Sequence, residues 1–407
     1  MKGVVKFFIT LGVFSILTGV SVVFAGDCLE RAITNGTVNG EVKVWYQTND
    51  KDTNSNNIFD KENSIFDAGL RLGYITDTFY GFGAGINFYA VDDLGAYGNF
   101  ADKSIHKVPH GETASWLGEA YLTYNRVNTL VKAGRQNIKS PLINSDEWAV
   151  FPNNFEACLL QNMDLPATTI RTAYITEERT LANEKFEDIA EDGVIMLGVV
   201  NESLPDSTLS AYYYRVDDVD NTDAVYLEAK TKLDIFNLAG QYMFIDPDTT
   251  NTDKTNAFGL KAGAVFGIFG LSVAYTSVDD GTVYATKISD NGIKTPLYTA
   301  TLSGDGDIAG AVDTDSYKIA ASVKPLEGLK LIASYAYYDH GDCIDLPANL
   351  QNQESKSAEL IIKYTGIENV SMFLAYINSD HHLTGAWCGA DSDDYLNTIR
   401  FWAKYEF

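Results

Sequence analysis

The 407-residue chain lacks several features that would place it in a common class of protein. After residue 25 it has no run of about 18 consecutive apolar residues, which excludes a membrane-spanning helix. It has four cysteines, too few for a disulfide framework, and no Pro- or Ser-rich linker that would separate two domains. Basic residues are outnumbered, with 30 Lys and Arg against 55 Asp and Glu, which argues against a nucleic-acid partner.

The N-terminus has the pattern of a secretory signal peptide. Lys2 and Lys6 precede an apolar run, and Val23 and Ala25 are small residues at the two positions that a signal peptidase reads. Removing both lysines leaves 28 basic and 55 acidic residues, a net charge of −27. We therefore expect three parts: a cleaved signal peptide over 1–25, an N-terminal periplasmic segment without periodicity over 26–37, and one domain over 38–407.

The rest of the chain alternates apolar and polar residues with the two-residue period of half-buried β-strands. The eighteen predicted strands cover residues 38–48, 64–75, 80–91, 115–125, 128–136, 155–163, 168–176, 193–202, 207–216, 222–233, 236–245, 256–266, 269–278, 315–324, 329–338, 355–364, 369–379 and 394–407. The content of 33 glycines, 24 tyrosines and 21 phenylalanines suits a β protein with many turns.

Short and long connections alternate strictly between these strands. Short ones such as 126–127 and 234–235 are followed by long ones such as 137–154 and 279–314. A soluble sandwich has no reason to keep this order, whereas outer-membrane barrels have short turns on one side and long loops on the other. The sequence therefore predicts an all-β, 18-stranded, transmembrane antiparallel β-barrel in the outer membrane of a Gram-negative cell.

The distribution of charge along each strand supports this prediction. In 222–233, Glu228, Lys230 and Lys232 share one face, and apolar residues occupy the other. A basic side chain turned to lipid at mid-membrane costs roughly 2 to 4 kcal/mol, so the charged face should line the lumen. The chain also ends on an apolar alternation that stops at Phe407, which is typical of barrels delivered to the outer membrane.

The third long connection, which follows Gln136, has the composition of a loop that packs against the protein. It contains Pro, Asn and Ser but also apolar residues, among them Trp148 and Phe151. Apolar loops are usually buried against another element. We predict that it folds back into the barrel and narrows it, with Asp146 and Glu147 facing the passage.

Three stretches of this region, GRQ at 134–136, PLINSD at 141–146 and FPNNFE at 151–156, resemble the OprD type of outer-membrane porin. Members of that family are eighteen-stranded barrels with an inward third extracellular loop and a basic ladder facing it. The resemblance implies passive diffusion of small hydrophilic solutes and ions, especially anionic or zwitterionic carboxylates, through a monomer or trimer in contact with outer-membrane lipid. It implies no cofactor, metal or catalytic residue. The predicted lumenal ladder is Arg71, Lys132, Arg135, Arg171, Lys230, Lys232, Lys261 and Arg400.

Other readings of the extracellular loops stay open. The pairs Asp339-His340 and Asp380-His381 could activate water in an outer-membrane hydrolase. An adhesin or a purely structural barrel is a further alternative. Cys343 and Cys388 fall in the last two long connections and are predicted to form a disulfide, or with nearby histidines to hold a transition metal.

Overall fold

The computed structural model describes residues 25–51, 57–145, 147–180, 185–217, 221–248, 253–283, 296–302, 308–341, 353–381 and 394–407. The predicted acidic residue Asp146 and the predicted disulfide partners Cys343 and Cys388 lie outside these ranges. Among the described residues, no helix has the length and apolar character needed to cross a bilayer.

The described residues form nineteen strands and three short helical segments, one of which is a 3-10 turn over 308–310. The strands are β1 (Thr37–Lys51), β2 (Ser64–Ile75), β3 (Phe82–Asp92), β4 (Thr113–Arg126), β5 (Thr129–Gln136), β6 (Asn154–Asn162), β7 (Thr168–Arg179), β8 (Glu187–Asp188), β9 (Val194–Asn201), β10 (Ser207–Val216), β11 (Thr222–Leu233), β12 (Phe236–Pro247), β13 (Thr255–Phe266), β14 (Phe269–Val278), β15 (Thr314–Leu326), β16 (Leu329–His340), β17 (Gln353–Ile367), β18 (Val370–His381) and β19 (Asp394–Glu406). The other two helical segments are α2 (Ala25–Thr34) and η2 (Lys61–Asn63).

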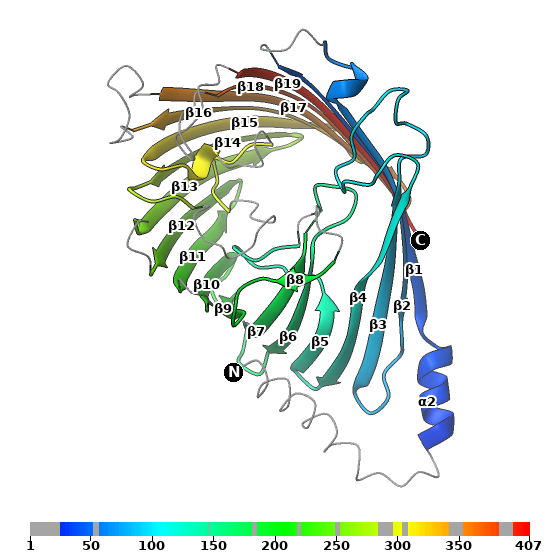
Figure 1. The fold of residues 1–407 in the computed structure, drawn as a ribbon. Coiled ribbons are helices and arrows are strands. Elements are labelled where there is room, and N and C mark those ends of the chain that lie inside the picture. The colour runs from blue at the N-terminus through cyan, green and yellow to red at the C-terminus, as the bar shows by residue number, and fades with distance from the viewer. Residues whose placement is uncertain are drawn as a thin grey trace.

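Eighteen of the strands close into one antiparallel barrel. Each pairs with its neighbour along the chain, and β1 pairs with β19 in a register that sets Trp45 opposite Trp402. Figure 1 shows the strands as a tilted wall around an interior, with α2 beyond one end. The predicted fold is therefore confirmed. The two-residue strand β8 was not predicted. It pairs with β7 and is not one of the eighteen strands that close the barrel.

The two faces of the wall differ as the alternation requires. On β13, Leu260 faces outward and is 59% exposed, while Ala257 on the inward face is fully buried. Leu227 on β11 is exposed as well, whereas Glu228 beside it is bonded from inside the barrel by Tyr298. Large apolar side chains therefore form the outer surface, and polar and charged ones meet the lumen.

The N-terminal segment is helical, although no period was expected there. The helix α2 is tied to the turn between β2 and β3: the Asp77 amide donates to Ala32 O at 2.9 Å, and the Tyr74 hydroxyl donates to Ile33 O. The last turn of the helix and the start of β1 are thus fixed beside the short-turn end of the barrel.

Candidate functional site

The connection between β5 and β6, residues 137–153, is called loop 3 here, and its first half is a small hairpin. The Ser145 amide donates to Ile138 O at 2.7 Å, and the Ser140 amide donates to Ile143 O at 3.0 Å. Ile138, Leu142 and Ile143 are buried in a cluster with inward residues of β7, β9 and β10. The Leu142 amide also donates to the hydroxyl of Tyr214, on the inner face of β10, at 3.3 Å.

The second half of loop 3 is held by β1. The buried Lys43 ammonium donates to the carbonyl oxygens of Glu147, at 3.1 Å, and Ala149. The Trp45 indole N–H donates to Trp148 O at 2.9 Å. In the ring order β10 is the eighth neighbour of β1 in a barrel of eighteen strands, so the two are nearly opposite. Loop 3 therefore crosses the interior of the barrel.

The connection between β14 and β15, residues 279–313, is called loop 7, and its described segment 296–302 also lies inside the barrel. Tyr298 donates to Glu228 Oε1 on β11 at 2.8 Å, and Lys318 on β15 donates to Ala300 O at 2.5 Å. The Leu302 amide donates to Oε1 of the buried Glu359 on β17. Burial, followed by the hydrogen bond to Glu228, raises the pKa of Tyr298 far above its usual range, so this hydroxyl stays a donor.

Beneath loop 3 lies a cavity of about 370 Å³, called the loop-3 chamber. Its walls come from loop 3, from β1, β2, β3, β17, β18 and β19, and from Leu302 of loop 7. Five basic and three acidic side chains line it: Lys43, Arg71, Lys363, Arg400 and Lys404 against Glu41, Glu147 and Glu406. Its charge therefore leans positive in a protein whose formal net charge is −25.

Aromatic rings alternate with the cations in this chamber. Phe373 and Trp402 are stacked with their centroids 5.5 Å apart and their planes 4° from parallel. The Arg400 guanidinium lies 5.1 Å from the ring of Trp148, and Arg400 Nε donates to Gln47 at 2.8 Å. The Lys363 ammonium is 5.8 Å from the ring of Phe373. The chamber thus offers flat apolar surface and positive charge side by side.

A larger cavity of about 780 Å³, called the lysine chamber, lies against β10 to β17. Its charged lining residues are Lys230, Lys232, Lys261, Lys318 and Lys330 with Asp206 and Glu359. Leu297, Tyr298 and Ala300 of loop 7 line this chamber, whereas Leu302 lines the loop-3 chamber. The segment 297–302 therefore lies between the two cavities.

The predicted ladder is distributed over three places. Arg71 and Arg400 line the loop-3 chamber, and the three lysines of β11 and β13 line the lysine chamber. Lys132, Arg135 and Arg171 line neither of these chambers. They sit on β5 and β7 beside wall partners: Glu119 at 3.9 Å, Glu156 at 3.5 Å and Gln161 at 2.8 Å respectively.

The acidic side of the predicted constriction is described only at Glu147. Its side chain lines the loop-3 chamber and is 58% exposed, and its Oε1 lies 3.3 Å from Nζ of Lys139 in the same loop. Its ion pair is therefore local to loop 3. The role of the Asp146-Glu147 pair in the passage remains a prediction.

Sequence reasoning missed the aromatic lining and loop 7. Trp402 shares the parity of Arg400 and Lys404 on the last strand, so an aromatic residue on a charged face was the available signal. Phe373 on β18 gave no such signal, because only its partners across the ladder reveal its contacts. Loop 7 contains Leu297 and Tyr298, the same kind of apolar content that singled out loop 3.

The hydrolase alternative named His340 and His381, both expected in loops, but they end β16 and β18. His340 is 5% exposed, with Nδ1 2.8 Å from the Thr314 hydroxyl and Nε2 2.9 Å from the Ser355 hydroxyl. Ser355 is fully buried. Both ring nitrogens are thus engaged away from solvent, which does not support water activation at this position.

The barrel is similar to solved porin structures. The match to OccAB3 of Acinetobacter baumannii has a TM-score of 0.75 and 15% identity, over 92% of this chain and 100% of that chain. For a BenF-like porin from Pseudomonas fluorescens Pf-5 the TM-score is 0.76 with 11% identity, over 92% and 99%. For Pseudomonas aeruginosa OccK3 (OpdO) it is 0.69 with 17% identity, over 93% and 97%. No family model and no curated protein matches the sequence. The resemblance to OprD-type porins is confirmed at the level of the fold.

Proposed function

We propose that this protein is an outer-membrane porin, exported by a cleaved signal peptide, that lets small anionic or zwitterionic solutes diffuse passively into the cell. The observation that carries the proposal is a closed barrel whose interior is crossed by loop 3 and lined beneath it by five basic side chains. Passage requires contacts strong enough to admit a solute and weak enough to release it. Single cations spread along a wall meet that condition.

The lining of the loop-3 chamber supports one class of solute over others. A carboxylate can pair with Arg400 or Lys363, while a flat apolar group attached to it can lie against Phe373 and Trp402. A cationic solute meets the same positive wall and is repelled. We therefore propose aromatic carboxylates as the preferred cargo among small organic acids.

Conductance of the purified protein in a planar bilayer tests the proposal. We expect steady single-channel steps in potassium chloride, interrupted more often by benzoate than by acetate at equal concentration. Benzylamine, which carries the opposite charge on the same ring, is the control and should not interrupt the current. Absence of steps would refute the channel; steps that benzoate and acetate interrupt equally would refute only the solute class.

A further inference from the structure

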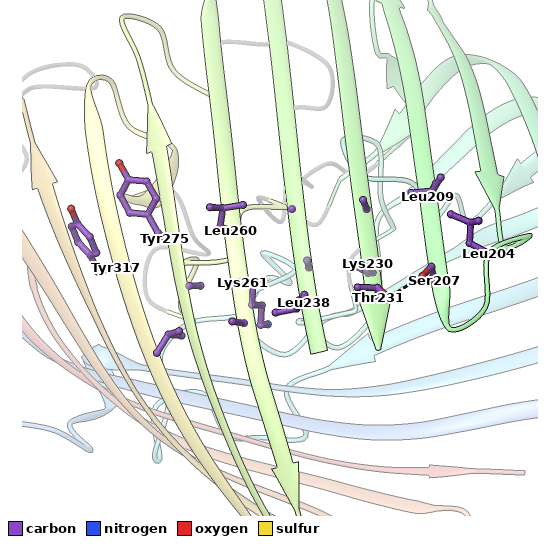
Figure 2. A pocket seen from close by; sticks show the side chains of 16 residues that line it. Leu204, Ser207, Leu209, Lys230, Thr231, Leu238, Leu260, Lys261, Tyr275 and Tyr317 are labelled. Carbon is purple, nitrogen blue, oxygen red and sulfur yellow. Dashed lines mark hydrogen bonds between the residues drawn. The ribbon is translucent and has the colours of Figure 1, made fainter. Parts of the chain in front are cut away.

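The outer surface of the barrel carries a groove of about 720 Å³ between β10 and β15 that the pore does not use. The strand register sets four outward residues in one row: Leu209, Ala229, Gly240 and Leu260. Two small side chains between two leucines leave a trough in an otherwise bulky surface. Figure 2 shows the larger side chains on consecutive strands, from Leu204 at one side to Tyr317 at the other.

Both ends of the groove are marked by polar groups. Toward the short turns, Ser207 Oγ donates to Thr231 Oγ1 at 2.9 Å, and both hydroxyls lie on the outward face (Figure 2). Ser207 Oγ also lies 3.0 Å from Pro205 O, and a serine hydroxyl has one hydrogen. The Thr231 hydroxyl can donate into the groove in the arrangement in which Ser207 donates to Thr231. Toward the long loops, Tyr275 borders the groove and its hydroxyl donates to Asp315 Oδ1 at 2.7 Å. Between these ends the outward side chains are apolar, and Lys230 and Lys261, which also line the lysine chamber, border the groove from their strands.

The backbone conformation at Gly240 does not require a glycine, so the trough is not a consequence of how the strand folds. A Cβ added at Gly240 would meet only Leu260 Cδ2 at 3.6 Å and Gly259 O at 4.0 Å, which are ordinary van der Waals contacts. A larger side chain would therefore fit at this position without strain in the strand. The glycine leaves open space on the outer face, and a substitution can fill it.

We propose that this groove is a binding site for one acyl chain of a glycerophospholipid. The chain would enter from the leaflet next to the short turns, with its ester carbonyl accepting from Thr231 and its methyl end toward Tyr275. The groove is continuous with the apolar outer face that a membrane barrel presents to lipid. Lipid hydrocarbon chains therefore surround the groove and can fill it. An unfilled trough would forfeit dispersion contacts along its whole lining.

The shape of the groove argues against a second copy of the chain as its occupant. In a twofold pair the same patch meets itself, and two concave surfaces facing each other leave a void between them. Because lipid tails are as apolar as leucine, retention of one chain comes from close packing and from the hydroxyl at its end. The site therefore selects by shape and by the position of one hydrogen bond.

The test is phospholipid retention after purification in a mild detergent, measured by native mass spectrometry and by phosphorus analysis. We expect one phospholipid on the wild-type barrel and a loss of roughly fivefold or more in Gly240→Leu, which fills the trough. Thr231→Val keeps the volume and should retain an intermediate amount. The matched control is Ala90→Leu on β3, whose cross-strand partner Leu70 is itself exposed on the far side of the barrel.

Folding is checked separately, by heat-modifiable gel mobility and by an unchanged single-channel conductance. If Gly240→Leu does not fold, Ala229→Val narrows the same trough with a smaller side chain. The proposal is overturned if the wild type retains no phospholipid or if filling the trough leaves retention unchanged. It is also overturned if the wild type is an oligomer without lipid that Gly240→Leu converts to a monomer, because the occupant is then a second copy.

Discussion

Glu147 and Lys139 carry opposite charges on the same loop at the edge of the loop-3 chamber, with their side chains 58% and 71% exposed. We expect Glu147→Gln to shift the ion selectivity toward anions, because it removes a negative charge beside the passage while the wall stays positive. Lys139→Gln is the matched control and should shift selectivity toward cations. The reversal potential in a salt gradient measures both. An exposed ion pair contributes about 0 to 1 kcal/mol to the free energy of unfolding, so both variants should still fold.

The outcome also tests the predicted role of loop 3. If Glu147→Gln and the double variant with Asp146→Asn both leave the reversal potential at the wild-type value, the acidic side of the constriction is elsewhere. Shifts of the reversal potential in opposite directions for Glu147→Gln and Lys139→Gln would place the charged end of loop 3 in the ion path.

Arg400 is the ladder residue best placed to bind a carboxylate. It lines the loop-3 chamber, while Gln47 and Trp148 hold its guanidinium in place. Replacing it with glutamine removes a charge-assisted contact worth roughly 1.5 to 3 kcal/mol, so block by benzoate should weaken about tenfold or more. Arg171→Gln is the control, since Arg171 lines neither chamber. Equal effects of the two variants would show that the ladder acts only through its total charge.

At the scale of single residues, the sequence could predict faces but not partners. The alternation sets Arg71 and Arg400 on the lumenal face because a cation in lipid is costly. It does not show that Lys139 pairs with Glu147 in the same loop. Such a pair depends on how the loop folds, which no strand period encodes.

Lys43 is an anchor for loop 3 as an element. The residue is 4% exposed, and its ammonium donates to two carbonyl oxygens of the loop. Lys43→Met would leave those oxygens without this donor at a cost of about 1 to 3 kcal/mol. We expect loop 3 to open more often, which limited proteolysis would detect as faster cleavage between residues 137 and 153. Lys404→Met in the same chamber is the control, because Lys404 pairs with Glu406 on its own strand.

Glu359 has the corresponding role for loop 7. Its Oε1 accepts from the Leu302 amide, and its Oε2 accepts from the Ser334 hydroxyl at 2.6 Å. We expect Glu359→Ala to release the segment 297–302 from the wall and so to raise the single-channel conductance. Glu359→Gln keeps an oxygen for the Leu302 amide and should leave the conductance near the wild-type value. A rise in both variants would assign the effect to charge instead of to the position of the loop.

The strands themselves were predictable because lipid enforces the period of two. Ser64–Ile75 and Phe269–Val278 were predicted with the bounds that the structure has. Near the long loops the prediction stopped early: β16 continues to His340 and β1 to Lys51. There the hydrogen-bonded strand pairs extend beyond the apolar band of the barrel. Neither face of the strand has to be apolar in that region, so apolar and polar residues no longer alternate. The short helix α2 and the strand β8 are set by tertiary contacts, so they gave no periodic signal.

At the scale of the whole molecule, the strongly acidic composition and the basic interior are compatible because they occupy different places. Ten basic residues line the two chambers, five in each. The 55 acidic residues outnumber the basic ones nearly two to one, so most of them must lie outside the chambers. With the acidic residues outside and the basic ones along the passage, the positive electrostatic field is concentrated in the lumen. The low-dielectric wall of the barrel strengthens this field.

Closure of the barrel depends on the seam between β1 and β19, which joins the two ends of the chain. Gly40 and Phe407 exchange backbone hydrogen bonds of 2.8 and 3.0 Å at the end of this seam. The Phe407 ring covers Gly40 so closely that an added Cβ would come within 2.2 Å of it. The strands β1 and β19 are further apart in the sequence than any other pair of bonded strands among those described. Pairing them therefore costs the most chain entropy, which the contacts of the seam must offset.

Phe407→Ser should therefore lower the yield of closed barrel more than the loss of one apolar side chain explains. Phe236→Ser is the matched control, since Phe236 is 52% exposed and Phe407 is 50% exposed. Refolding into detergent followed by heat-modifiable gel mobility measures the closed fraction for each variant. A side chain that contributed only apolar area would make the two variants equal. A larger loss in Phe407→Ser means that the final residue stabilises the seam itself, because the two phenylalanine rings are equal in area and nearly equal in exposure.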